Sequence, residues 1–435
     1  MSEIEDDEYS AEASSAYPPS IQAGIPKLGE TPSGWTRFRL GDLLKRVERP
    51  AKLIDSESYQ LVTAKRNRGG IVAREVLRGK QIKTKTQFYV EARDFLISNR
   101  QISHGACGLV PSSLHGAVVS NEYTAFHTSK YLDPAFLNAL SHSVYFQQTC
   151  FHSSIGVHVE KLVFRLEDWM GWEFDVPPLP EQQRIVAVVS AWDRAIEQTE
   201  RLIAAKRQRL SALVTKLVFT RAQASKLKIS KRVRLGDLAA IIRGVTYRPE
   251  RDVVSGKSES AISILTAGNI QAGQVSVSGD ELRVRISTAK NEQIARLGDF
   301  VLSMSNGSRN LVGKAGAVRI EPALLSAPGA FCAILRPHSE ENRLLAALLF
   351  QSEGYREQLH IALAGSSINN LTNSELAEFE FALSPEITPA LLQSNSCVVD
   401  DIMATEIYIA NLYKQKRGLM QKLLAGEWRL GRNFE

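Results

Sequence analysis

The chain of 435 residues contains an internal sequence repeat, and this repeat restricts the possible folds more than any other feature. The matches keep one order, and the interval between them grows in loop-sized steps from 195 to 205 to 213 residues. The sequence therefore predicts two copies of one unit of about 200 residues. The repeated segments are Leu40–Leu43 (LGDL) with Leu235–Leu238, Asp94–Ser98 (DFLIS) with Asp299–Ser303 (DFVLS), and Ser153–Ile155 with Ser366–Ile368.

Each copy begins with a mixed globular part and ends in a long helix. In the first copy, short β-type runs such as Gln87–Val90 and Phe95–Ser98 are separated by Gly, Ser and Asn turns. The motif PPLPEQQ at Pro177–Gln183 predicts the start of the helix, with a proline at the first helical position and the acid Glu181 in the first turn. The second copy has LSPEITPALLQ at this place, which leaves the start of its helix less well defined.

Apolar residues in both closing helices fall on a heptad seam with alternating steps of three and four. This pattern predicts two helices packed side by side as an antiparallel coiled coil, with an amphipathic core helix as the alternative. The seam includes Thr199, Lys206, Thr405 and Lys416 among apolar positions. Its apolar members are Val189, Trp192, Ile196, Ile203, Leu210, Leu213 and Leu217 in the first helix, and Val398, Ile402, Ile409, Leu412, Leu419 and Leu423 in the second.

A helix of about 35 residues is about 50 Å long at 1.5 Å per residue. An antiparallel pair of such helices would form a rigid spacer with one globular unit at each end. A protein of this shape should read two short sequences separated by an unread gap of about one DNA turn, roughly 34 Å.

Composition favours a polyanionic partner and a cytoplasmic location. The formal net charge is +6 and the sequence pI is about 9.0. The longest dense apolar run, Leu344–Phe350, falls short of the roughly 18 residues that a membrane span needs. The acidic start MSEIEDDEYS is unlike a signal peptide.

The sequence contains no pattern typical of a metal, cofactor or catalytic site. Cys107, Cys150, Cys332 and Cys397 are scattered, and we expect buried reduced thiols. Gly307–Lys314 departs from a phosphate loop in the spacing of its glycines and in Ala315, which replaces the Ser or Thr. We therefore expect no cofactor, no metal and no enzymatic activity in this chain itself.

Several of these segments resemble the specificity subunits of Type I restriction–modification enzymes. The resemblance rests on Gly34-Trp35, LGDL, DFLIS, PPLPEQQRI, and the basic helix ends Lys206–Leu210 and Lys414–Gly426, and it extends from about Ile25 onward. It implies two target recognition domains that each read half of a bipartite double-stranded DNA site. It also implies that the paired helices dock two methyltransferase subunits, that restriction subunits join through the complex, and that the subunit has no catalytic residues.

The expected fold class is α+β, with two mixed α/β target recognition domains separated by the antiparallel helix pair. The degraded motif in the second copy leaves open whether the second helix docks a methyltransferase as the first does. The expected parts are a disordered acidic leader (1–33), the first recognition domain (34–178), the central helix (179–220), a basic linker (221–231), the second recognition domain (232–386), the C-terminal helix (387–428) and a tail (429–435).

Candidate DNA-binding residues lie in polar and cationic loops, where Arg and Asn suit bidentate contacts with bases. For any single residue, a solvated loop is an equal alternative. Lys80, Lys83 and Lys85 would share one face if their segment is a strand. The candidates are Lys65, Arg66, Asn67, Arg68, Lys80, Lys83, Lys85, Asn99, Arg100 and Gln101 in the first copy, and Arg243, Thr246, Tyr247, Arg248, Ser305, Asn306, Ser308, Arg309, Asn310, Ser367 and Asn369 in the second.

The segment from Arg201 to Arg234 holds eleven Lys or Arg residues and no acid. It could contact DNA phosphates, form a solvated helix face, or meet a partner protein. Two other functions also remain open for the whole chain, a free-standing two-headed DNA-binding regulator and a coiled-coil scaffold without a nucleic-acid role.

Overall fold

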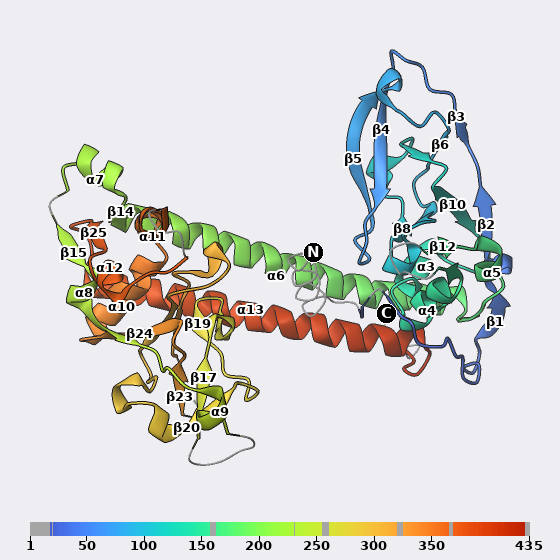
Figure 1. The fold of residues 1–435 in the computed structure, drawn as a ribbon. Helices are drawn as coiled ribbons and strands as arrows, with labels where there is room; N and C mark the ends of the chain where they lie inside the picture. Colours follow the sequence, from blue (N-terminus) through green and yellow to red (C-terminus); the bar gives the residue numbers. More distant parts are fainter. Residues whose placement is uncertain are drawn as a thin grey trace. The chain divides into compact units, whose positions relative to one another are not determined.

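The computed structural model describes residues 18–19, 21–156, 162–229, 231–254, 261–319, 325–364 and 369–430. The chain divides into two compact units (Figure 1). The first unit is Met1–Glu200 with Ile407–Glu435, and the second unit is Arg201–Glu406. No helix in the described ranges is long and apolar enough to cross a membrane.

The first unit is built on two sheets, a four-stranded one in the order β2-β10-β7-β8 and a five-stranded one in the order β3-β6-β9-β4-β5. Its strands are β1 (Thr36–Arg39), β2 (Leu44–Val47), β3 (Pro50–Ala51), β4 (Ser58–Ala64), β5 (Ile71–Arg78), β6 (Gln87–Tyr89), β7 (Phe95–Ser98), β8 (Cys107–Leu109), β9 (Val118–Ser120), β10 (Tyr123–Thr128), β11 (Ser154–Ile155), β12 (Val163–Phe164) and β13 (Glu173–Val176). Its shorter helices are α2 (Leu40–Leu43), α3 (Pro134–Leu140), α4 (Val144–His152) and α5 (Leu166–Met170), with 3-10 turns η1 (Gly79–Gln81), η2 (Ile102–His104) and η3 (Ser112–Leu114).

The second unit has a six-stranded sheet in the order β16-β24-β21-β22-β19-β18 and two three-stranded sheets, β20-β17-β23 and β14-β25-β15. Its strands are β14 (Val218–Phe219), β15 (Arg232–Arg234), β16 (Ala239–Arg243), β17 (Ala261–Leu265), β18 (Ile270–Gln271), β19 (Gln274–Val275), β20 (Arg283–Arg285), β21 (Phe300–Ser303), β22 (Ala315–Ala317), β23 (Ser326–Pro328), β24 (Cys332–Pro337) and β25 (Glu380–Leu383). Its shorter helices are α7 (Arg221–Lys226), α8 (Leu235–Leu238), α9 (Pro249–Asp252), α10 (Glu340–Phe350), α11 (Glu353–Ala364) and α12 (Asn373–Ala377), with 3-10 turns η5 (Ala267–Asn269), η6 (Ile286–Thr288), η7 (Asn291–Gln293) and η8 (Arg309–Leu311).

The internal repeat is confirmed by the strand order. The four strands β2-β10-β7-β8 of the first unit have the same order and antiparallel pairing as β16-β24-β21-β22 of the second. Both copies of LGDL form a short helix, α2 and α8, ahead of the first of these strands. The third repeated segment of the second copy, Ser366–Ile368, lies outside the described residues.

The turn before the DFLIS strand is repeated in atomic detail. The carboxylate of Asp94 accepts the backbone N–H of Glu91 at 2.8 Å, and Asp299 accepts that of Arg296 at the same distance. The residue before each aspartate has a positive φ, 71° at Arg93 and 89° at Gly298. A left-handed backbone is therefore built into this turn in both copies, although only one of them has a glycine there.

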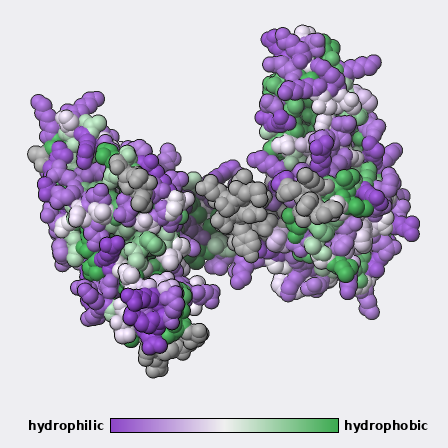
Figure 2. Space-filling view, in the orientation of Figure 1, coloured by the Kyte–Doolittle hydropathy of each residue, from purple (hydrophilic) through white to green (hydrophobic). Residues whose placement is uncertain are grey.

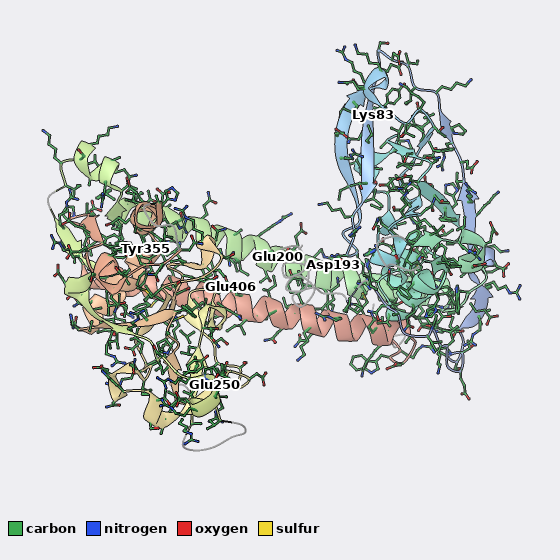
Figure 3. All side chains as sticks on the ribbon, in the orientation of Figure 1. Lys83, Asp193, Glu200, Glu250, Tyr355 and Glu406 are labelled. Atoms are coloured by element: carbon green, nitrogen blue, oxygen red, sulfur yellow. The ribbon has the colours of Figure 1, made fainter. Side chains whose placement is uncertain are left out.

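The two long helices are α6 (Leu179–Leu217, 39 residues) and α13 (Pro389–Leu424, 36 residues). Every predicted seam position is buried or half-buried. Figure 3 labels Asp193 and Glu200 on α6. In the first unit, Asp193 pairs with Lys416 and Glu200 accepts a hydrogen bond from Tyr413, so residue numbers rise along α6 while they fall along α13. The second unit has Lys206 paired with Asp401 at 2.8 Å, in the same sense. The expected antiparallel coiled coil is thus confirmed.

The two helices begin differently, as the sequence indicated. At the start of α6, the buried amide of Gln182 donates to the carbonyl oxygens of Tyr131 and Pro177, both at 2.8 Å. At the start of α13, the Thr388 hydroxyl accepts the Leu391 N–H at 3.2 Å, and Pro389 is the first helical residue. The second helix therefore has a good N-terminal cap of its own despite the altered motif.

The described residues of the predicted basic linker, 221–229 and 231, include a short helix. Thr220 caps the short helix α7 with a reciprocal bond to Gln223, and the flanking strands β14 and β15 both pair with β25. This stretch is therefore part of the folded second unit, because both of its ends are fixed by backbone hydrogen bonds to one strand.

We predict that Gly298→Ala weakens the second unit by about 1–2 kcal/mol, since an L side chain at this φ approaches the carbonyl oxygen. Hydrogen exchange of the β21 amides in the full chain measures the change. Arg93→Ala is the matched control and should change exchange in β7 little, because that turn already holds a side chain at positive φ. Equal effects of the two substitutions would contradict this account of the turn.

Candidate nucleic-acid interface

The first cluster of candidate DNA-binding residues in the first unit, Lys65–Arg68, lies in the turn of the β4–β5 hairpin. Lys65 donates its N–H to Gly70 O at 2.9 Å, and Asn67 and Gly70 have φ of 54° and 71°. Lys65, Arg66 and Asn67 are exposed in this turn. Arg68 is buried and its guanidinium donates to the backbone oxygens of Pro18 and Pro19. The candidate Arg68 thus holds the N-terminal segment and is not displayed to solvent.

The second cluster, Asn99–Gln101, directly follows β7. The Asn99 N–H donates to Glu122 O at 2.8 Å, and the Glu122 carboxylate binds the Arg100 guanidinium at 2.8 Å. Arg100 and Glu122 are exposed, at 73% and 47% of their side-chain surface. The hairpin turn adjoins this loop, because Asn67 donates its N–H to His104 O at 2.8 Å. The structure therefore brings Lys65–Asn67 and Asn99–Gln101 together.

Lys80, Lys83 and Lys85 lie elsewhere, and their segment is not the strand that would place them on one face. The segment forms the 3-10 turn η1 and then an irregular stretch before β6. It follows Arg78, which pairs with Ser58 at the hairpin end opposite the turn (Figure 3). At roughly 3.3 Å per residue, seven residues of β4 separate these lysines from the hairpin turn by about 20 Å. The Lys85 ammonium donates to Gly79 O at 2.9 Å.

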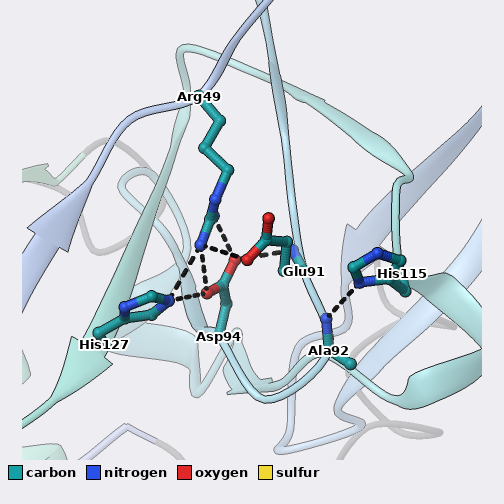
Figure 4. A network of polar contacts seen from close by, with 6 residues as sticks. All are labelled: Arg49, Glu91, Ala92, Asp94, His115 and His127. Carbon is teal, nitrogen blue, oxygen red and sulfur yellow. Dashed lines mark hydrogen bonds and ion pairs between the residues drawn. The ribbon is translucent and has the colours of Figure 1, made fainter.

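A buried carboxylate fixes the strand that presents Asn99–Gln101 (Figure 4). Asp94 is fully buried at the turn before β7, where it binds Arg49 at 2.8 Å and His127 at 3.0 Å. In the second unit, Asp299 binds Arg336, which stands on β24 at the place of His127 on β10. Both copies thus have the buried carboxylate, but its arginine partner lies between β2 and β3 in the first unit and on β24 in the second.

The second unit joins two of the predicted clusters directly. Ser305 and Asn370 form a β-bridge, and Asn306 donates its N–H to Asn369 O at 3.3 Å. The Asn369 side-chain amide donates to Gly307 O at 3.1 Å. Ser308, Arg309 and Asn310 continue this loop and are exposed. Ser367 lies outside the described residues.

The third cluster, Arg243–Arg248, meets this loop at a pocket of ≈600 Å³. Thr246 and Tyr247 line the pocket together with Ser305 and Asn306. Arg243 and Arg248 are exposed beside it in the sequence. Residues about 60 positions apart in the chain are thus collected into one surface of the second unit, with polar groups that can donate and accept hydrogen bonds.

Two residues of these surfaces were missed by the sequence reasoning. Glu122 and Phe331 precede β10 and β24, and both carbonyl oxygens accept the N–H of the residue after the DFLIS or DFVLS strand, Asn99 or Met304. The two short segments share no motif, so only the strand pairing identifies them as equivalent. Figure 2 shows that the visible surface is mostly hydrophilic, with apolar residues in small groups.

The basic segment 201–234 is partly neutralised within the second unit. Lys206 and Arg207 pair with Asp401 and Glu406 on α13, and Arg232 and Arg234 pair with Glu380 beside them. Arg209, Lys216, Arg221, Lys226 and Lys228 are exposed. Ion pairs within the second unit therefore account for four of these cations, two on α6 and two on β15, and phosphate contact remains a prediction for the exposed ones.

No group of three or more His, Cys, Asp or Glu side chains suited to a metal ion occurs among the described residues. Cys107, Cys150 and Cys332 are buried free thiols, but Cys397 is exposed, which corrects the expectation of four buried ones. Cys397 lies on the solvent-facing side of α13, one position before the seam residue Val398. Burial raises the pKa of Cys107 to about 12 and that of Cys332 to about 11, so neither is a thiolate at neutral pH.

Comparison with known proteins shows which class of protein the chain is similar to. Residues 32–206 match the family described as the Type I restriction modification DNA specificity domain. The EcoKI specificity subunit of Escherichia coli K12 is 28% identical over 207 residues, which cover 46% of this chain and 43% of that protein. The StySPI specificity subunit of Salmonella potsdam is 34% identical over 134 residues, 31% of this chain and 28% of that protein. The chain thus spans less than half the length of these two relatives.

A third relative matches along nearly the whole chain. The MjaVIII specificity subunit of Methanocaldococcus jannaschii is 24% identical over 92% of this chain and 94% of its own length. The S subunit of the Type I system of M. genitalium has the same fold, with a TM-score of 0.56 at 14% identity over 92% of this chain and 99% of that one. A chain from work on the assembly of the type I R-M system has a TM-score of 0.52 at 20% identity, over 92% and 100%.

These findings confirm the resemblance to the specificity subunits of Type I restriction–modification enzymes. The curated relatives are all named specificity subunits, and the matching family is described as a DNA specificity domain.

We predict that Asp94→Asn lowers the free energy of unfolding of the first unit by about 3 kcal/mol, because it leaves Arg49 without its buried partner. All five tryptophans of the chain belong to the first unit, so tryptophan fluorescence during urea unfolding of the full chain reports on it. Glu48→Gln is the control, since it breaks only the exposed pair with Arg46 and should cost less than about 1 kcal/mol. Similar midpoints for Asp94→Asn and the unaltered chain would contradict the anchoring role of Asp94.

Proposed function

We propose that this chain is the DNA-recognition subunit of a Type I restriction–modification complex and that it reads a bipartite site. Each unit reads one half-site, and the base pairs between the half-sites are not read. The observation that carries the proposal is one strand framework that occurs in both units with different polar side chains at matching positions.

The matching positions follow from the strand register. Phe95 pairs with Phe126 in the first unit and Phe300 with Leu335 in the second, so the loop after β7 is equivalent to the loop after β21. On this alignment Arg100 and Gln101 stand where the second unit has Ser305 and Asn306. A framework that is kept while its loop residues change is what two readers of different sequences require.

The proposed partners follow from the family. We propose that the chain docks two methyltransferase subunits and, through the complex, restriction subunits. Apolar side chains on the outside of the long helices support a protein-binding role, since Ile407 and Tyr408 on α13 and Leu202 on α6 are 58%, 56% and 48% exposed. We also propose that the two recognition domains extend over residues 34–178 and 232–386.

A genome-wide map of methylated bases with and without the gene tests this function. We expect one bipartite methylated motif to disappear when the gene is removed, and to return when it is restored. Unchanged methylation together with sequence-specific DNA binding would indicate a free-standing regulator. Absence of both would overturn the proposed function.

Two matched variants test the assignment of one half-site to each unit. Arg100→Ala should relax the motif in one half only, and Asn306→Ala should relax it in the other half only. Each lost contact should cost about 1–3 kcal/mol of discrimination at its base pair. Relaxation of both half-sites by one variant would contradict the assignment.

A further inference from the structure

The turn between β23 and β24 displays an aromatic ring. Phe331 is 72% exposed, the largest fraction among the exposed large hydrophobic residues of the described chain. Exposing most of a phenylalanine ring is unfavourable by itself, and an exposed aromatic group beside polar side chains is typical of a binding site.

Backbone hydrogen bonds fix the position of the residue that carries this ring. Phe331 O accepts the N–H groups of Met304 and Ser305 at 2.8 and 3.1 Å, and Cys332 donates to Gly329 O at 2.8 Å. The neighbouring strand lies so close that a Cβ on Gly244 would be 2.0 Å from Gly329 O. The main chain of Phe331 therefore cannot move inward without breaking several backbone hydrogen bonds, so the residue stays at the surface before any ligand binds.

The surroundings of the ring fit the edge of a base pair. Phe331 borders the pocket lined by Thr246, Tyr247, Ser305 and Asn306, so an apolar group lies among hydrogen-bonding groups. Arg243, Arg248 and Arg309 are exposed on the adjacent loops and supply positive charge for phosphates. In the major groove, the apolar group that distinguishes one base from the others is the thymine methyl, and phenylalanine is one of the side chains that contact it.

The first unit supplies an internal comparison. At the position of Phe331 it has Glu122, whose carboxylate binds Arg100, and at the position of Arg100 the second unit has Ser305. The first unit thus presents a charged pair, which can bind guanine and cytosine edges, where the second presents a ring and a hydroxyl. The equivalent position is charged in the first unit, as Glu122, and apolar in the second, as Phe331, so the two units can read different bases there.

We propose that Phe331 is a specificity-determining residue that reads a thymine methyl group in the half-site of the second unit. The inference rests on the proposed function and adds to it the identity of one base pair, an A·T pair, and the side chain that selects it. Ser305 and Asn306 would supply the hydrogen bonds to neighbouring base edges.

The test uses the full chain in complex with its methyltransferase subunits and DNA duplexes that carry the motif from the methylation map. Each thymine of both half-sites is replaced in turn by deoxyuridine, which removes only the methyl group. We expect one substitution in one half-site to weaken binding about fourfold, the factor that one buried methyl group contributes. The Phe331→Ala complex should bind the thymine and deoxyuridine duplexes equally.

Two further variants complete the design. Phe331→Leu keeps an apolar side chain and should retain part of the preference for thymine. Leu297→Ala removes another exposed apolar side chain of the second unit, 59% exposed, and should leave the preference unchanged. A half-site without an A·T pair, or a deoxyuridine effect that persists in Phe331→Ala, would overturn the inference.

Failure of the inference is distinct from failure of the proposed function. If only the inference fails, the unaltered complex still prefers its motif over other sequences, but Phe331 does not change the effect of removing any thymine methyl group on binding. If the proposed function fails, the unaltered complex has no preferred sequence, which overturns both.

Discussion

The apolar seam between α6 and α13 is the interaction on which both units depend. The repeat in the sequence and the compact units of the structure do not coincide, because each unit contains part of both helices. Met420, Leu423 and Leu424 from the end of the second copy complete the core of the first unit around Leu40 and Phe95. Val214 and Leu217 from the end of the first copy complete the core of the second unit. Neither copy of the repeat would bury its apolar surface fully without the helix of the other.

Charged side chains within the seam restrict how the helices can pair. Lys416 is 1% exposed and pairs with Asp193, and Lys206 binds both Asp401 and Thr405. Burying an ammonium group gives little net stability, but a shifted pairing would leave it without a partner at a cost of several kcal/mol. These contacts therefore specify the register of the antiparallel pair more than they increase its stability. A fixed register is what a protein needs if its helices set the distance between two recognition sites.

The sequence predicted the elements that depend on periodicity and repetition. The seam, the two long helices and the DFLIS strands were found because each residue of such a pattern supports the next. Lys80–Lys85 and residues 221–231 were not, because an isolated charged segment has no pattern that distinguishes a strand, a 3-10 turn or a linker. Arg68 has the composition of a base-reading residue, yet its guanidinium holds the carbonyl groups of Pro18 and Pro19. Phe331 carries no signal in the sequence, and only the pairing of β21 with β24 reveals its relation to Glu122.

We have proposed that the two copies of one strand framework read two separated sequences on one DNA. Interference mapping tests this proposal most directly, with the complex bound to a duplex from which single bases have been removed at random. If each unit reads one half-site, missing bases weaken binding in two short blocks and have no effect in the gap between them. A single continuous block, or weaker binding when bases are missing from the gap, would show that the two units do not read two separated sequences.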